Sequence, residues 1–171
     1  MAAITQVVLA QAAVAVDRMT LHERVQLADE IHLRQPNLLA SILVLHRMGV
    51  SMAQLDVPVN ILLVAYQAMK MTGHRWPVIS EQIQERCLQR LTGRIRFIEG
   101  LTAELLRQAV DQQVNQHAEP YLLAFVFGRL SDHDLLGVRT EAEKYLMLAA
   151  LNLVECIAAT ADIAGGHEPR S

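Results

Sequence analysis

The chain has 171 residues, of which 52% are hydrophobic and 19% are charged, with a net charge of −3 at pH 7. A domain of this length buries about 70% of its extended surface, so it needs neither a disulfide nor a metal for stability. The isoelectric point of 6.1 argues against nucleic acid as a partner. The share of hydrophobic residues is higher than in an average globular domain, which predicts that some apolar side chains are buried in an oligomer interface.

Caps and glycines divide the chain into predicted helices joined by short loops. A hydroxyl residue followed three positions later by Glu or Gln marks helix starts at Thr20, Ser51 and Thr140. Helix ends are marked by Gly49, Gly73, Gly100 and Gly165–Gly166. About eight helices are expected, at 3–18, 20–33, 36–48, 51–72, 80–98, 102–117, 120–130 and 140–163. No alternating strand pattern occurs, so the predicted fold is an all-α orthogonal bundle.

Four segments need a choice between interpretations. Pro58 predicts that the fourth helix is divided into a short turn and a long helix that begins near Asp56. Residues 2–16 are apolar, but no basic residue precedes them, which favours an amphipathic helix over a secretory signal. Residues 145–161 contain Asn152 and Glu155, which favour a core helix over a membrane span. The tail 165–171 is polar and is expected to be disordered.

Two stretches 84 positions apart repeat one pattern. Residues 35–40 read Gln-Pro-Asn-Leu-Leu-Ala, and residues 119–124 read Glu-Pro-Tyr-Leu-Leu-Ala. At the same offset Leu62 corresponds to Leu146 and Ala65 to Ala149. The echo predicts half-repeats at 20–72 and 104–157, connected by 73–103, within one domain at 1–164. The alternative is two ordinary helical hairpins that follow the same rules for starting a helix.

Two segments, Ile61–Met69 and Tyr145–Val154, are apolar almost all round their helices. A helix without a polar face belongs in the middle of a domain. We therefore expect these segments to form a central pair, flanked by the helices at 36–48 and 120–130.

The chain has two cysteines, Cys87 and Cys156, which lie on predicted helices without a neighbouring cysteine. This placement predicts two reduced, buried thiols in a cytoplasmic protein, and a disulfide is the alternative.

Residue spacings give no enzyme signature. The seven histidines show none of the His-x-x-x-His or Glu-x-x-His spacings that bind metals, and no phosphate-binding or dinucleotide-binding loop occurs. Asp29 and His32 share one helical turn, where a surface contact is the alternative to a metal ligand pair. The run 131–134 suits a helix cap better than catalysis. We expect no cofactor and no metal.

The middle of the chain contains the best candidate site. Residues 70–107 hold seven basic and four acidic residues, a balance of +3, whereas residues 108–171 hold four basic and nine acidic ones, a balance of −5. Arg86, Arg90 and Arg94 recur every four residues and form a ridge on one helix. Such a ridge suits carboxylates of a partner or phosphates, and the alternative is a solvated face paired with acidic residues of the same chain.

The only tryptophan, Trp76, follows Arg75 between two predicted helices. It is either a contact anchor at an interface or a plug between the two halves of the fold. The sequence therefore predicts a non-enzymatic interaction or regulatory protein that acts as a homodimer through apolar helix faces and the ridge of arginines. Its predicted contact residues for an acidic protein partner are Arg75, Trp76, Arg86, Arg90 and Arg94.

Two other functions stay open from sequence alone. The first is binding of a small apolar molecule, or an unrecognised enzymatic activity, in a pocket between the long helices. Residues expected to line that pocket are Tyr66, Met69, Met71, Tyr145 and Met147. The second is a nucleic-acid-binding regulator, which the low isoelectric point disfavours. No membrane association is expected.

Overall fold

The computed structural model describes residues 1–95 and 100–164, with side chains up to residue 161. These residues form eight α-helices, one 3-10 helix and no strand, which confirms the all-α prediction. The elements are α1 (Gln6–Asp17), α2 (Leu21–Arg34), α3 (Pro36–Leu43), η1 (Val44–His46), α4 (Met52–Met71), α5 (Glu81–Ile95), α6 (Ala103–Gln116), α7 (Pro120–Asp132) and α8 (Glu141–Ala164). The tail at 165–171 and the expected end of the fifth helix at 96–98 lie outside the described residues.

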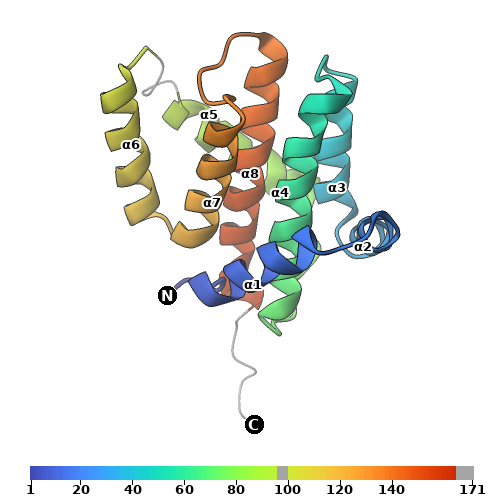
Figure 1. Ribbon diagram of the computed structural model, residues 1–171. Helices are drawn as coiled ribbons and strands as arrows, with labels where there is room; N and C mark the ends of the chain where they lie inside the picture. The colour runs from blue at the N-terminus through green and yellow to red at the C-terminus, as the bar shows by residue number, and fades with distance from the viewer. Residues whose placement is uncertain (96–99, 165–171) are drawn as a thin grey trace.

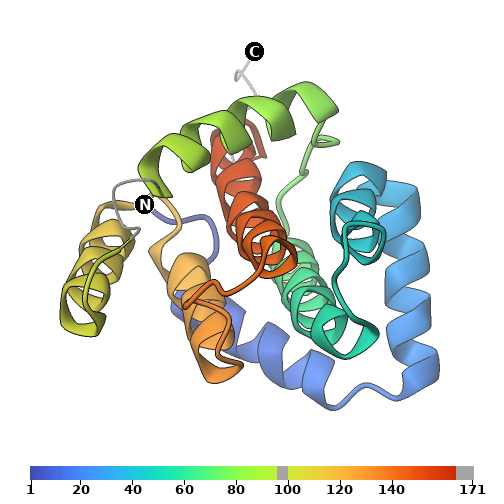
Figure 2. The same ribbon diagram turned by 90° about the horizontal axis from the view of Figure 1, so that it is seen from above.

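The two longest helices, α4 and α8, lie side by side in the centre of the bundle (Figures 1 and 2). Viewed from above, α1 and α5 run across this pair on opposite sides, and α3 and α7 flank it on the other two sides (Figure 2). The outermost helices are α2, beside α3, and α6, beside α7. The crossing of α1 and α5 over the central pair makes the bundle orthogonal.

Helix packing in the first half of the chain resembles packing in the second half. α1 packs on α4 as α5 packs on α8, and α3 touches both central helices as α7 does. The relation does not extend to α2 and α6, because α6 runs along the central pair whereas α2 is seen end-on, across it (Figure 1). This relation includes α1 and α5, which lie outside the half-repeats expected at 20–72 and 104–157. Internal duplication of the sequence stays a prediction.

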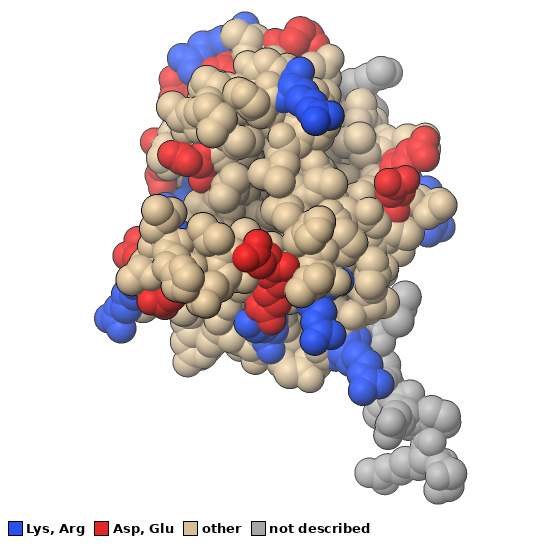
Figure 3. Space-filling model, turned by 90° about the vertical axis from the view of Figure 1, so that its right-hand side faces the viewer, with Lys and Arg blue, Asp and Glu red and all other residues tan. Residues whose placement is uncertain are grey.

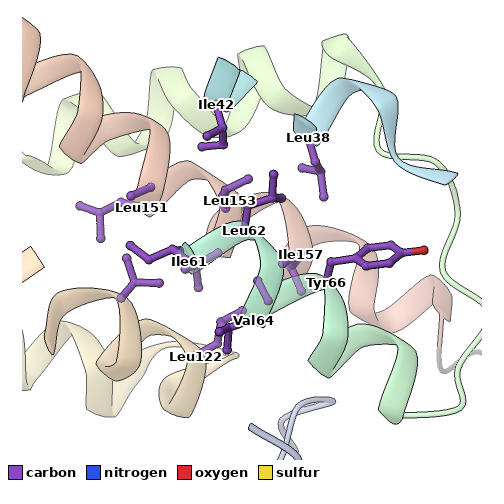
Figure 4. Close-up of a cluster of buried hydrophobic side chains, with 14 of the residues drawn as sticks. Leu38, Ile42, Ile61, Leu62, Val64, Tyr66, Leu122, Leu151, Leu153 and Ile157 are labelled. Atoms are coloured by element: carbon purple, nitrogen blue, oxygen red, sulfur yellow. The ribbon is translucent and has the colours of Figure 1, made fainter. Parts of the chain in front are cut away.

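The core is built around the middle of α4 (Figure 4). Ile61, Leu62 and Val64 pack among side chains of α3, α7 and α8, and every residue from Ile61 to Met69 except Gln67 is buried. The expected partner segment 145–154 does lie in α8, but it is not buried throughout, because Tyr145 at its start is exposed. The surrounding helices contribute Leu38, Ile42, Leu122, Leu151, Leu153 and Ile157 to the same cluster (Figure 4).

One stretch of α8, Glu141–Ala161, is long and apolar enough to cross a membrane. Half of its most apolar window is buried inside the bundle, where it packs on α4 and α5. A core helix of a bundle passes the same test of length and composition.

All three predicted hydroxyl caps start helices. Thr20 and Ser51 accept hydrogen bonds from the backbone N–H three residues on, at 3.2 and 3.1 Å, and Thr140 does the same for Glu143 at 3.1 Å. The reciprocal bond of the capping box, from the backbone N–H of the cap residue to the side chain three residues on, is absent at all three starts within the described chain; Thr20 Oγ1 donates to Glu23 Oε1 at 3.1 Å instead. Gln54 Nε2 donates to Glu143 Oε1 at 3.4 Å, which joins the starts of the two central helices.

Two boundary predictions were wrong. Pro58 does not divide the fourth helix, because α4 is continuous from Met52 and contains Pro58 in its interior. The cap is Ser51 rather than Asp56, and the single backbone bond that proline removes costs less than the burial of this turn contributes. The third helix also ends early, at Leu43, and continues as η1 before Gly49 turns the chain with a φ of 98°.

The residues that precede the opening prolines of α3 and α7 cross-link the two halves. Gln35 and Glu119 are both buried although they are polar. Gln35 Oε1 accepts from the N–H of Ile79, just before α5, at 2.9 Å. The Glu119 carboxylate accepts from the N–H groups of Ala3 and Ile4, just before α1, at 2.8 and 3.1 Å. Each half therefore supplies a side chain that fixes the entry into the first helix of the other half.

Candidate functional site

Trp76 packs against the end of α4. Its indole Nε1 donates to the carbonyl oxygen of Met69 at 3.0 Å and to Thr72 Oγ1 at 3.2 Å. The ring is half-buried and rests on the core, and Gly73, with a φ of 72°, lets the chain turn back toward it. This geometry matches the plug interpretation of Trp76 more closely than the anchor interpretation.

Arg86, Arg90 and Arg94 are exposed on α5, as their spacing predicts, but they do not form one free cationic surface. Arg94 Nη2 lies 2.9 Å from Glu155 Oε1 on α8, and Arg90 Nη2 lies 3.6 Å from Cys87 Sγ. Within residues 1–95 and 100–161, only Arg75 and Arg86 of the four predicted arginines lack such a partner. The intramolecular alternative is therefore correct for Arg94.

Glu155 is the centre of a polar cluster that joins α5, α8 and the link between α6 and α7. His117 Nε2 lies 3.1 Å from Glu155 Oε1, and His117 Nδ1 lies 2.9 Å from the backbone nitrogen of Glu119. Because that backbone N–H must donate to Nδ1, the proton of a neutral His117 is on Nε2 and points to Glu155. Both imidazole nitrogens are thus occupied, and His117 is not free to act as a base. No sequence signal connects these distant positions.

Two carboxylates have pKa values below their usual range. Burial alone raises the pKa of Glu155, but hydrogen bonds from His117 and Arg94 outweigh it, and the net pKa is lowered from 4.5. The side-chain hydrogen bond from Arg139 is the main cause of the lowered pKa of Glu143. Both groups therefore stabilise the fold while they are ionised.

We expect the protein to lose stability as the pH falls below 4.5, where the unfolded chain begins to take up protons that the folded protein still excludes. The stabilisation is fully present above the unfolded pKa and is lost as the pH falls through the lower folded pKa. Urea unfolding at pH 7 and at pH 3.5 measures this loss. A Glu155→Gln variant is expected to lose less stability between the two pH values; an equal loss in the variant would contradict the role of Glu155.

A groove of about 310 Å³ lies between α3 with η1, α5 and α8, and we call it the α3–α5–α8 groove. Among the residues that the structure describes, Glu85 is the only charged one in its lining. The rim includes side chains that are apolar and yet exposed, among them Val44, Met48, Leu88 and Tyr145. The apolar floor and walls are formed by Leu38, Leu45, Leu148, Ala149 and Leu153.

The groove contains one polar group that lacks a partner. Asn152 donates from Nδ2 to the carbonyl oxygen of Gln84 at 3.1 Å, which joins α8 to α5. Its Oδ1 is buried and accepts no hydrogen bond from the described residues. A buried acceptor without a donor is costly, and this oxygen is covered by protein atoms.

The pocket expected from the sequence is not formed by the residues named for it. Tyr66, Met69 and Met147 are buried in the core, whereas Met71 and Tyr145 are exposed. Tyr145 is the only one of the five that lines the α3–α5–α8 groove. The groove forms where α5 crosses α8, and a pattern along one helix does not report such a crossing.

A second hollow, of about 590 Å³, lies between α2, α4 and α7. Its lining mixes charges of both signs, with Arg24 and Arg129 near Asp56 and His133. Arg129 is held over the ring of Phe125, with its guanidinium carbon 5.3 Å from the ring centroid. The mixed charge makes this hollow a weaker candidate for an apolar contact than the α3–α5–α8 groove.

No protein-family model matches the chain, and no curated protein or solved structure is significantly similar to it.

Proposed function

We propose that this chain is a non-enzymatic interaction protein that forms a homodimer through the α3–α5–α8 groove and the exposed apolar residues around it. The observation that carries the proposal is an apolar surface that combines a hollow with protruding apolar side chains. The groove supplies the hollow, while Leu43 and Val44 on its α3 side protrude into solvent.

The charge of this side of the molecule suits a second copy of the same chain. In Figure 3 an uncharged area lies above a group of acidic side chains near the centre of the face, and other charged side chains lie around its edges. Residues 35–45, which include α3, contain no Asp, Glu, Lys or Arg. In a twofold dimer the same patch faces itself, so every charge meets a like charge near the axis. The patch limits that repulsion because Glu85 is the one charged residue among the described lining residues of the groove, and the apolar contact stabilises the dimer.

The polar clusters support binding rather than catalysis. Both nitrogens of His117 are occupied, and Glu155 is bound by both His117 and Arg94. Arg75 and Arg86 are exposed and remain candidates for contact with an acidic partner, because no ion pair within the described chain engages them. Trp76 is held by α4 and would support that surface from beneath.

The homodimer is tested by placing carboxylates on the rim of the groove. We expect the wild-type chain to sediment as a dimer at micromolar concentration and the Val44→Glu/Leu88→Glu variant to sediment as a monomer. Its dissociation constant should rise about 100-fold or more, because unpaired charges in an apolar interface cost several kcal/mol. Analytical ultracentrifugation measures both species, and circular dichroism checks that the helices are retained.

A matched control is available on other faces. Val14 and Leu105 are 48% and 49% exposed, close to the 43% and 39% of Val44 and Leu88. Val14→Glu/Leu105→Glu should leave the dimer intact. A wild-type monomer, or dissociation of the control as well, would overturn the proposed interface.

A second candidate function is binding of a small apolar molecule in the same groove. Asn152 in the lining of the groove favours it, since small-molecule sites combine apolar walls with a few directed polar groups. N-phenyl-1-naphthylamine, which is apolar and carries one N–H donor, is a suitable fluorescent probe. A wild-type monomer that binds this probe, with binding lost in Asn152→Leu, would favour this function over the homodimer.

A further inference from the structure

The packing of α5 on α8 brings the only two cysteines of the chain together. Cys87 and Cys156 are both free thiols, and both are buried. Asn152 Nδ2 donates to the carbonyl oxygen of Gln84 at 3.1 Å, and Arg94 Nη2 lies 2.9 Å from Glu155 Oε1. These two contacts bring the turn of α5 that contains Cys87 against the turn of α8 that contains Cys156, and a hydrogen bond with Cys87 is one of the causes that raise the pKa of the Cys156 thiol. Two reduced, buried thiols agree with the sequence prediction, but nothing in the sequence indicates that they are neighbours.

The pair lies between two hollows of the surface. Cys156 forms part of the lining of the α3–α5–α8 groove. On the other side, Arg90 approaches Cys87 Sγ to 3.6 Å and also lines a hollow of about 570 Å³ that contains His117 and Glu155. Hydrogen peroxide in the α3–α5–α8 groove thus reaches the wall that Cys156 forms, and in the second hollow it reaches Arg90 beside Cys87.

The two sulfurs have different surroundings. The guanidinium of Arg90 is placed to stabilise negative charge on Cys87 as that sulfur attacks an electrophile. Burial, the largest cause, raises the pKa of the Cys156 thiol, which keeps this group protonated. These surroundings suit Cys87 as the attacking sulfur and Cys156 as the resolving one.

We propose that Cys87 and Cys156 are a modification site at which a hydroperoxide forms a reversible intramolecular disulfide between α5 and α8. The Cys87 sulfur attacks one peroxide oxygen, the O–O bond breaks, and the first water leaves after taking the Cys87 proton. The Cys156 sulfur then attacks the sulfenic acid; the S–S bond forms, the S–O bond breaks, and the second water leaves with the Cys156 proton. Two thiols are oxidised and one hydrogen peroxide is reduced to two waters.

The test uses the full-length folded chain and hydrogen peroxide itself. After peroxide is removed, the protein is unfolded, free thiols are alkylated and tryptic peptides are mapped by mass spectrometry. We expect both alkylatable thiols to be lost, a linked peptide that contains Cys87 and Cys156, and full recovery after treatment with dithiothreitol. The protein should remain a single chain on a non-reducing gel.

Two variants assign the roles of the residues. Cys156→Ser should trap Cys87 as a sulfenic acid, which dimedone labels. Arg90→Ala should form the same disulfide several-fold more slowly, and Arg90→Lys should restore part of the rate, because the cation acts by positioning charge beside sulfur. Arg86→Ala is the matched control on the same helix and should leave the rate unchanged.

The inference would be overturned if both thiols stayed alkylatable after peroxide treatment, or if the disulfide joined separate chains. It would also fail if protein unfolded in urea formed the linked peptide as fast as folded protein did, since the fold would then contribute no proximity. Val44→Glu/Leu88→Glu retains both cysteines, so disulfide formation in this variant is judged independently of the homodimer.

Discussion

Replacing Leu146 by alanine is expected to lower the free energy of unfolding by about 2–5 kcal/mol. Leu146 is fully buried in the first half of α8. The substitution removes its apolar contacts and leaves a cavity between the central helices, which the surrounding side chains fill only in part. Urea unfolding monitored by circular dichroism measures the change.

The control for this substitution is Leu105→Ala. Leu105 is 49% exposed on α6, so its truncation should change the stability by no more than about 0.5 kcal/mol. If Leu146→Ala also had an effect this small, α8 would not form the centre of the folded protein.

Glu119→Ala should have an effect of similar size, about 2–4 kcal/mol, although it removes no large apolar group. The substitution takes away the acceptor for the N–H groups of Ala3 and Ile4, and Ile4 is fully buried. A buried donor that loses its partner costs about 1–3 kcal/mol. Besides unfolding in urea, hydrogen exchange at these two amides measures the effect directly, and both should lose protection.

Two further variants separate the hydrogen bonds of Glu119 from its charge. Glu119→Gln keeps one oxygen acceptor and should fall between wild type and Glu119→Ala. Asp111→Ala removes an exposed carboxylate from α6 and should change the stability by about 0.5 kcal/mol or less. Unchanged amide protection at Ala3 and Ile4 in Glu119→Ala would show that the carboxylate does not hold the N-terminal segment.

Helix boundaries were predictable where their causes lie within a few residues. The hydroxyl caps Thr20, Ser51 and Thr140 act on a backbone N–H three positions away, and Gly73, with a φ of 72°, follows the end of α4. Pro58 shows the limit of such local rules. Its ring disfavours a helix interior, yet burial of the same turn in the core retains the helix.

The candidate site was less predictable because its parts meet through helix crossings. The spacing of Arg86, Arg90 and Arg94 correctly places them on one exposed side of α5, but it does not show that Arg94 faces Glu155. The contact between Cys87 and Cys156 and the groove above it depend in the same way on how α5 crosses α8. Such angles follow from the packing of whole helix faces rather than from any short motif.

The sequence echo identified Glu119 as the residue before a helix start, but it gave no indication that Glu119 is buried. A glutamate before a proline is ordinarily a solvated residue at a helix start, and its acceptors become necessary only when the N-terminal segment packs beside it. The amide at the corresponding position, Gln35, meets a neighbouring segment through both its acceptor and its donor. The echo thus indicated two similar helix starts without indicating what each one binds.

The exchange of these two side chains between the halves has a consequence for folding cooperativity. A fragment that ended after α4 would retain Ala3 and Ile4 but lack the carboxylate that binds them, and the remaining fragment would lack the amide that holds Ile79. Neither piece contains the full set of partners for its own leading helix. The two halves therefore depend on each other for stability, and the protein should unfold in a single cooperative transition rather than as two separate units.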